Sequence, residues 1–219
     1  PMRTEGLSLS KCQARAGLDI PNGCEYVLLS FGGSLGAQAI NDSALALMEN
    51  FSSKHPEVFH IHSTGKNGYD EFMRKFREKG LDSCKNLRPS DYIYDMPKWE
   101  AAADAVICRS GAMTVSELAL MGKACLFIPS PNVVANHQFK NAEGLKNSDA
   151  ALLIEEKNLT ADALSSAAHD LLFTPLGAKL SENIRAFAKP EARELIYREL
   201  VRLSNRELLS LVGKEEANE

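Results

Sequence analysis

The sequence has little of what would indicate a nucleic-acid-binding or membrane-spanning protein. Its 219 residues contain 25 Lys and Arg against 29 Asp and Glu, a formal net charge of −4, whereas a nucleic-acid-binding domain usually carries a basic face. No apolar run is long enough to cross a bilayer. The hydrophobic content of 44% is sufficient for one sizeable core. We therefore expect a globular protein that does not bind nucleic acid.

Cysteine and histidine also occur without the spacing of a metal site. The five cysteines include no C-x-x-C pair, which favours reduced, packed thiols over a disulfide or a zinc site. The five histidines lack ligand spacing as well. His60 and His62 alternate in a predicted strand and should share one face, but no third ligand lies nearby. The sequence predicts no bound metal and no cofactor.

Two common nucleotide-binding signatures are missing. A dinucleotide-binding fold needs G-x-G-x-x-G and an acidic residue at the end of the second strand. Here the second predicted strand runs into Ser63-Thr-Gly-Lys66 instead. The glycine-rich turn after the first predicted strand is not followed by Gly-Lys-Ser/Thr, so it is not a nucleoside-triphosphatase phosphate loop.

What the sequence does contain is a regular alternation of apolar strands and amphipathic helices. The strands are expected at 25–31, 58–62, up to 91–93, 105–108, 124–128 and 150–154, and the helices at 37–51, 69–79, 97–103, from 114 to about 121, 136–147, 160–173 and 175–211 with a break at Pro190. Nearly continuous apolar strands are typical of a buried parallel sheet. We predict a Rossmann-like, parallel six-stranded sheet with helices on both faces and a C-terminal helical extension.

Ligands of such sheets bind outside the carboxyl ends of the strands, so the loops that follow each strand are the ones to inspect. The first is Phe31-Gly-Gly-Ser-Leu-Gly-Ala37. Its glycines allow a ligand to approach the backbone, Ser34 offers a hydroxyl, and the helix that follows favours an anion at its N-terminus. The same glycines are equally compatible with close packing of the helix on the strand.

The second candidate runs from Val106 to Gly122 and contains a strand, a turn of small residues and a helix start. Thr114 and Glu117 have the spacing of a capping box, in which each side chain bonds to the backbone of the other residue. A carboxylate can also accept two hydrogen bonds from the hydroxyls of a ribose. The spacing favours the cap over the ligand.

The third candidate is Asn136-His-Gln-Phe-Lys-Asn141-Ala, after the proline-rich loop that follows the fifth strand. Its amides suit the hydroxyls of a sugar. Asn136 is alternatively a helix cap, and His137 is either a general base or a surface residue at a helix start.

Together these segments resemble the bacterial N-acetylglucosaminyltransferases of glycosyltransferase family 28, which belong to the GT-B superfamily. The resemblance rests on G-G-S-L-G-A-Q-A-I-N (32–41), C-R-S-G-A-M-T-V-S-E (108–117) and N-H-Q-x-x-N-A (136–142), in the family's order and spacing. Asp91 to Met96 and Pro1 to Arg3 also fit family segments. The likeness extends to about residue 200.

The resemblance implies one half of a GT-B fold. Residues 1–189 would form the domain that binds UDP-N-acetylglucosamine, and residues 190–219 a C-terminal helix and polar tail. The acceptor domain, with the catalytic residues, is expected in a part of the protein that precedes Pro1, so no catalytic residue is assigned here. The resemblance also implies a set of donor contacts: Arg3, Ser34, Ile93, Ala112, Met113, Thr114, Val115, Ser116, Glu117, Gln138 and Asn141, with Gly32, Gly33 and Gly36 as the phosphate loop.

Within that set, the resemblance places the uracil against the backbone of Ile93 and the ribose hydroxyls on Glu117. Ser34, Arg3 and the backbone of 112–114 would surround the diphosphate, and Gln138 and Asn141 would contact the sugar. Arg109 has no clear role; pairing with a core carboxylate is one alternative.

The implied reaction is an inverting, metal-independent transfer of N-acetylglucosamine to the C4 hydroxyl of lipid I, giving lipid II for peptidoglycan. We expect this chain alone to be inactive, because lipid I would bind the other domain. The whole protein would act at the cytoplasmic face of the inner membrane, with weak or indirect membrane contact from this half. Two alternatives stay open: a donor-binding subunit of a split transferase, and an enzyme like UDP-N-acetylglucosamine 2-epimerase, whose catalytic carboxylate and histidine set is not found here.

Overall fold

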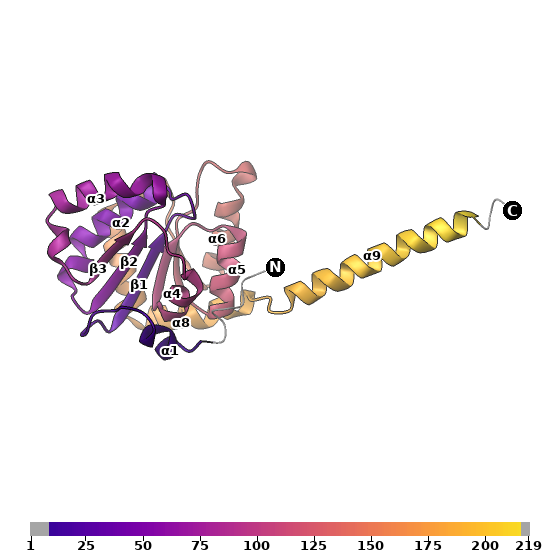
Figure 1. Cartoon of the computed structure of the whole chain (residues 1–219), viewed down its shortest axis with the longest axis horizontal. Helices are drawn as coiled ribbons and strands as arrows, with labels where there is room; N and C mark the ends of the chain where they lie inside the picture. The colour runs from indigo at the N-terminus through magenta and orange to yellow at the C-terminus, as the bar shows by residue number, and fades with distance from the viewer. Residues whose placement is uncertain (1–8, 216–219) are drawn as a thin grey trace. The chain divides into compact units, whose positions relative to one another are not determined.

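The computed structural model describes residues 9–215 of the chain, with side-chain surroundings up to residue 204. Two compact units are present: the larger ends at Ala188, and the smaller contains the helix α9 (Ala192–Glu215). Figure 1 shows the strands and α1 to α8 in the larger unit. Everything that positions the candidate site belongs to that larger unit.

The larger unit is built on six parallel strands in the order β3-β2-β1-β4-β5-β6. They are β1 (Tyr26–Phe31), β2 (Val58–Ser63), β3 (Leu87–Ser90), β4 (Ala105–Cys108), β5 (Ala124–Phe127) and β6 (Leu152–Leu153). The chain moves outward from β1 to β3 and then returns to place β4 on the other side of β1. The predicted six-stranded parallel sheet is confirmed, and its topological switch point lies between β1 and β4.

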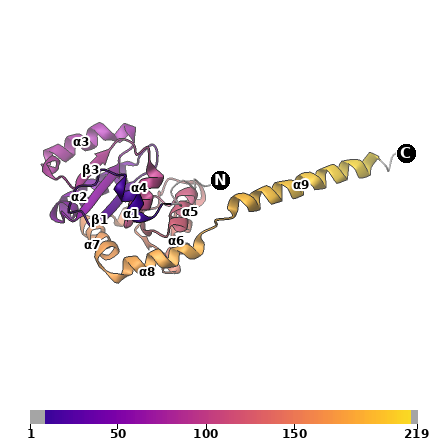
Figure 2. The same cartoon turned by 60° about the horizontal axis from the view of Figure 1, so that its bottom comes forward.

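Helices cover both faces of the sheet, as predicted. They are α1 (Lys11–Ala16), α2 (Gln38–Asn50), α3 (Tyr69–Glu78), α4 (Met96–Ala102), α5 (Ala112–Met121), α6 (His137–Asn147), α7 (Ala161–Phe173) and α8 (Pro175–Asn183). α4, α5 and α6 pack on one face, and α2 and α7 on the other, with α3 beside α2 (Figures 1 and 2).

Strand alternation decides which face each side chain enters. In β1, Val27 and Leu29 contribute to the core beneath α4, α5 and α6, whereas Leu28 contributes to the core beneath α2 and α7. All three are fully buried. Ser30 lies on the same face as Leu28, because side chains two residues apart share a face, and this places one hydroxyl in the second core.

One predicted strand end was wrong. We expected the third strand to end at 91–93, but β3 ends at Ser90. The Asp91 carboxylate accepts a hydrogen bond from the Tyr92 N–H at 2.7 Å, a local turn that competes with pairing along the sheet. Ile93 is apolar because its side chain is buried in the core below the loop, not because it continues the strand.

The C-terminal region is helical on both sides of Pro190, as predicted. A short 3-10 turn, Ile184–Phe187, follows α8, and α9 begins at Ala192. Ion pairs run along α9 between Arg198 and Glu194 and between Arg202 and Glu199. Within residues 9–215, no helix combines the length and apolarity needed to span a membrane.

Candidate functional site

The central strands end at one level of the sheet. Phe31, the last residue of β1, pairs with Ser63 of β2 on one side and with Cys108 of β4 on the other. Cys108 in turn pairs with Phe127 of β5. The loops that follow these strands therefore begin side by side, and the crevice at the switch point lies between the loop after β1 and the loop after β4.

The two helices that begin at this crevice have no side-chain caps. The N-cap residues are Ala37 for α2 and Gly111 for α5, and neither helix has a side-chain hydrogen bond at its cap. Ser10, Thr160 and Thr174 cap α1, α7 and α8, whereas α3, α4 and α6 lack side-chain caps as well. The first N–H groups of α2 and α5 are thus open to a ligand, and two helix N-termini on one crevice favour an anion.

The glycine loop after β1 has features of both alternatives, close packing of the backbone and an exposed turn that a ligand can approach. Gly36 has φ +78°, and a Cβ there would collide with the Thr64 carbonyl of the neighbouring loop. Gly33 has φ +99° with open space around it, and its carbonyl accepts from the Gly36 N–H at 3.0 Å. Close packing therefore explains Gly36, while the turn leaves Ser34 exposed at the crevice.

The capping-box interpretation of Thr114 and Glu117 was wrong. α5 begins two residues earlier than expected, at Ala112, because the extended backbone of Gly111 already serves as its N-cap. Thr114 is inside the first turn, and Glu117 is in the second. The half-buried Glu117 carboxylate has no hydrogen-bond or ion-pair partner among the residues that the structure describes, so it is available to a ligand.

The other predicted contacts on α5 lie in the same two turns. Met113 is half exposed, and Ala112 is exposed beside it. The Ser116 hydroxyl donates to the Ala112 carbonyl at 2.8 Å, a bond within the helix. Val115 packs partly against the core. The backbone of 112–114 and the side chains of Thr114 and Glu117 are therefore the parts of α5 best placed for a ligand.

Gln138 and Asn141 are brought to the same turn by α6. The Ser110 hydroxyl donates to the Gln138 carbonyl at 2.8 Å, and the Asn141 amide donates to the Ser110 carbonyl at 3.1 Å. The Gln138 side-chain oxygen accepts from the Ser130 N–H at 2.9 Å. These bonds hold α6 against the β4–α5 turn. The Gln138 side-chain N–H₂ and the Asn141 side-chain oxygen have no such partner among the described residues.

The backbone just before α6 is strained. Ala135 and Asn136 both have positive φ, 53° and 52°, which is unfavourable for Ala but is tolerated by Asn. Asn136 occupies the N-cap position but makes no side-chain cap bond, so its interpretation as a cap was wrong. The His137 ring donates from Nδ1 to the Val134 carbonyl at 2.9 Å. Such strain is typical of ligand-binding segments.

The structure also places the remaining predicted residues. Arg109 donates to the Ile128 carbonyl at 3.1 Å and pairs with Glu156. Its alternative role as a partner of a carboxylate is confirmed, but that carboxylate lies on a partly exposed 3-10 turn and not in the core. Ile93 anchors its loop by a buried side chain, which leaves its backbone as the part that can reach a ligand. Arg3 lies outside the described residues.

One buried feature was only partly foreseen. His60 and His62 do share a face, since both bond to the Ser30 hydroxyl at 2.8 Å. Burial lowers the pKa of each to about 3, so both rings are neutral. Ser30, Ser52 and Asn41 complete the group, and their polar types within apolar segments were the available signal. Within the described residues, no cluster of His, Cys, Asp or Glu is suited to hold a metal ion.

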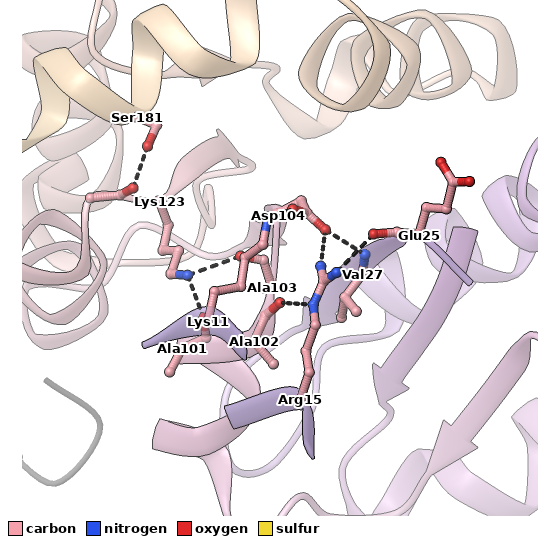
Figure 3. Close-up of polar contacts among 11 residues, drawn as sticks. Lys11, Arg15, Glu25, Val27, Ala101, Ala102, Ala103, Asp104, Lys123 and Ser181 are labelled. Atoms are coloured by element: carbon pink, nitrogen blue, oxygen red, sulfur yellow. Dashed lines mark hydrogen bonds and ion pairs between the residues drawn. The ribbon is translucent and has the colours of Figure 1, made fainter. Parts of the chain in front are cut away.

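Two cavities in the described part of the chain lie at opposite edges of the sheet. One of about 580 Å³ lies at the amino edge of the sheet, lined in part by Asp104 and Lys123. Lys123 donates to the Ala101 and Ala103 carbonyls at 2.7 and 2.9 Å (Figure 3), and burial lowers its pKa to about 8. The other, of about 530 Å³, borders Ser130 and Asn136 at the carboxyl edge. The charged groups that line the second cavity are also paired, Glu156 with Arg109 and Glu155 with Lys157, so the cavities do not locate the site. The open helix N-termini of α2 and α5 do, and they lie at the carboxyl edge.

Known proteins match this chain over most of its length. The glycosyltransferase family 28 C-terminal domain matches residues 27–198. A protein of Desulforudis audaxviator named "UDP-N-acetylglucosamine--N-acetylmuramyl-(pentapeptide) pyrophosphoryl-undecaprenol N-acetylglucosamine transferase" is 37% identical over 90% of this chain and 53% of its own length. One of the same name from Acetivibrio thermocellus is 38% identical, over 90% and 52%. The chain spans about half the length of these curated relatives.

Solved structures agree on the architecture. The crystal structure of Acinetobacter baumannii MurG superposes with a TM-score of 0.71 at 28% identity, over 90% of this chain and 55% of that one. UDP-GlcNAc 2-epimerase from Neisseria meningitidis, bound to UDP-GlcNAc, gives a TM-score of 0.60 at 13% identity, over 88% and 48%; that likeness concerns the fold alone. The predicted Rossmann-like half of a GT-B fold is confirmed.

Proposed function

The chain belongs to glycosyltransferase family 28, and from that premise we propose that it is the half of an N-acetylglucosaminyltransferase that binds UDP-N-acetylglucosamine. The observation that carries the proposal is the pair of uncapped helix N-termini, those of α2 and α5, on the two sides of the switch point. The donor's diphosphate carries the charge that such a crevice favours.

The donor would lie along the carboxyl edge of the sheet. Its diphosphate would contact the Ser34 hydroxyl and the backbone of 112–114. Glu117 would accept hydrogen bonds from the ribose hydroxyls, and the absence of a partner for its carboxylate in the described part of the chain supports this role. The uracil would lie against the backbone of Ile93.

The N-acetylglucosamine would be contacted by the two α6 side chains that hold the β4–α5 turn. Gln138 would donate from its side-chain N–H₂, and Asn141 would accept at its side-chain oxygen. Because the other ends of both amides are bound to the protein, their orientation is already determined before a ligand arrives. A contact from Arg3 to the diphosphate remains a prediction.

Chemically, this half would stabilise the leaving group. As the bond from the sugar to UDP breaks, negative charge grows on the diphosphate, and the open N–H groups of α2 and α5 are oriented to receive it. The acceptor, lipid I, and the base that deprotonates its C4 hydroxyl would belong to the other half of the protein. The product would be lipid II, for peptidoglycan synthesis.

Exposed apolar side chains at the carboxyl edge of the sheet support a second surface that faces this edge. Leu35, Tyr94, Met113 and Val134 lie on four different segments after strands, and each is at least half exposed. We propose that residues 1–189 form the donor domain, that 190–219 comprise a C-terminal helix and a polar tail, and that a further domain completes the cleft. The whole protein would work at the cytoplasmic face of the inner membrane, with little lipid contact from this half.

Titration calorimetry of the 219-residue chain with UDP tests the proposal. We expect the chain to bind UDP, and both Glu117→Gln and Glu117→Ala to weaken binding by about tenfold to a hundredfold, as for loss of charge-assisted hydrogen bonds. The melting temperature should stay within about 1 °C, because Glu117 is not a cap.

Glu143→Gln, on the exposed side of α6, is the matched control and should bind UDP like the parent chain. No binding of UDP to the parent chain would overturn the proposed function. Unchanged affinity in both Glu117 variants would overturn the ribose contact.

A further inference from the structure

A chain of buried hydrogen bonds runs beneath α2 towards the glycine loop. Ser52 bonds to His60 Nδ1 at 2.9 Å, His60 Nε2 to the Ser30 hydroxyl at 2.8 Å, and that hydroxyl to His62 Nδ1 at 2.8 Å. His62 Nε2 then bonds to the Asn41 side-chain oxygen at 3.2 Å. Every residue in it is at most 4% exposed.

The hydrogen bond of the Asn41 amide determines which group donates and which accepts in every other bond of the series. The Asn41 amide N–H₂ donates to the Thr64 carbonyl at 3.0 Å, and a carbonyl can only accept. The Asn41 oxygen therefore faces His62 and accepts from its Nε2–H. With its proton on Nε2, His62 accepts from the Ser30 hydroxyl at Nδ1, and the Ser30 carbonyl 3.1 Å from that nitrogen is then a close contact and not a hydrogen bond. The Ser30 hydroxyl in turn accepts from the His60 Nε2–H, and Ser52 donates to His60 Nδ1. Each group donates towards Thr64, and such aligned chains strengthen one another.

The series of hydrogen bonds ends at the Thr64 carbonyl, which lies against the glycine loop of the candidate site. Gly36 lies so close to the Thr64 carbonyl that no Cβ would fit there, and Gly65 lies equally close to the Leu35 carbonyl and the Gly36 nitrogen. The two loops thus touch backbone to backbone, with no side chain between them. Asn41 also donates its own N–H to the Ala37 carbonyl at 2.9 Å, so it contacts both sides of the junction.

We infer that Asn41, oriented by His62, is a positioning residue that holds the Gly32–Ala37 loop in its anion-binding shape by clamping the Thr64 carbonyl. It does not touch the ligand itself. The inference rests on the proposed function only for the identity of the ligand, since the clamp acts on the loop whether or not a nucleotide is bound.

A matched control exists within the chain. Asn86 is also buried, and its amide donates to the carbonyls of Ser52, His55 and Val58 at 2.8, 3.2 and 2.9 Å. It precedes β3 and so lies at the opposite edge of the sheet from the glycine loop. Removing either amide leaves buried carbonyls without a donor, but only Asn41 contacts the loop junction.

The test compares Asn41→Leu with Asn86→Leu by UDP calorimetry, well below both melting temperatures. We expect Asn41→Leu to weaken UDP binding about tenfold and Asn86→Leu to leave it within about twofold, although both lose stability. Equal UDP affinity in the two variants would overturn the inference.

Two variants of His62 provide a second test if Asn41→Leu does not fold. His62→Gln retains an N–H donor towards Asn41 and should keep most of the UDP affinity, whereas His62→Leu should lose about as much as Asn41→Leu. Equal loss in both variants would contradict a role for His62 in orienting Asn41.

Amide hydrogen exchange provides a readout that does not depend on the ligand. The Gly36 N–H, which bonds to Gly33 within the loop, should exchange about tenfold faster in Asn41→Leu than in Asn86→Leu. If the parent chain fails to bind UDP but this difference is found, the proposed function is wrong and the clamp stands. If UDP binds and the difference is missing, the clamp is wrong.

Discussion

The two edges of the sheet use their polar groups in opposite ways. At the amino edge, Asp104 accepts from the Val27 N–H at 2.7 Å and pairs with Lys11 and Arg15, while Lys123 binds two carbonyls (Figure 3). At the carboxyl edge, the Ser34 hydroxyl and the Glu117 carboxylate have no partner within the described residues.

The difference shows that satisfied and open polar groups are better guides to a site than cavity size. The larger cavity borders groups that already bond to the fold, so a ligand there would have to replace good hydrogen bonds. At the carboxyl edge, open N–H groups and an unpaired carboxylate would gain bonds from a ligand. The comparison predicts that changes at the amino edge alter stability, and changes at the carboxyl edge alter binding.

Acidification should have the largest effect on stability, because it acts on His60 and His62 in the buried hydrogen-bond network between the two edges. Burial lowers the pKa of His60 and His62 from 6.5 to about 3, so below 6.5 the unfolded chain takes up two protons that the folded chain excludes. Stability should therefore fall as the pH drops from 6.5 towards 3, by up to about 2.7 kcal/mol per pH unit.

Urea unfolding at a series of pH values measures this slope. His62→Gln should reduce it by about half, because one titrating group is removed. His169→Gln, which removes an exposed histidine on α7, should leave it unchanged. Stability independent of pH between about 6.5 and 4.5 would show that the buried rings are not held neutral.

Asp104→Ala should have the next largest effect, and on stability alone. It removes the acceptor of the Val27 N–H and leaves the partly buried Arg15 without its carboxylate, so we expect a loss of about 3 kcal/mol. Asp42→Ala, which breaks a more exposed pair with Lys75, should lose less than about 1 kcal/mol. UDP affinity measured on the folded variants should be unchanged. A large loss of affinity would contradict the prediction that changes at the amino edge alter stability alone.

Two glycines with positive φ give the finest comparison. Gly36→Ala would push a Cβ into the Thr64 backbone, whereas Gly122→Ala, at the C-cap of α5, would meet only the flexible end of Arg185. We expect losses of about 2–3 kcal/mol and about 1 kcal/mol respectively, with UDP binding impaired only in Gly36→Ala. Thermal unfolding and calorimetry on both variants would reveal the pattern, and equal binding would contradict it.

Much of the fold was predictable because its signals are local. A strand such as Ala105–Cys108 is an apolar run that ends at a turn of small residues, and α7 begins after Thr160, whose hydroxyl caps it at the Ala163 N–H. The end of the third strand was missed because Asp91 forms a local turn that no apolar pattern reports. The glycine, Thr114–Glu117 and Asn136–Asn141 segments could be proposed as candidates because residues suited to ligands follow strands there.

The state of each site residue could not be predicted, because it depends on partners distant in sequence. Arg109 is engaged by Glu156, 47 residues away, and Asn141 by Ser110, 31 residues away. Asn41 lies within the family segment 32–41, but the sequence assigns it no role, since its contact with Thr64 arises only when α2 packs on the sheet beside β2.

The sequence by itself determined the order of strands and helices and the residues that follow each strand, since periodicity and turn-forming residues act over a few positions. It also contained enough of the glycosyltransferase family 28 pattern to indicate the family. Only the tertiary structure decided that α5 begins at Ala112, which leaves Glu117 free of a cap, and that a buried chain of hydrogen bonds ends beneath the glycine loop. Both depend on contacts between residues that are distant in sequence. Hydrogen bonds in a buried environment are stronger than in water, and a buried polar group without a partner is costly, so these contacts decide the local structure.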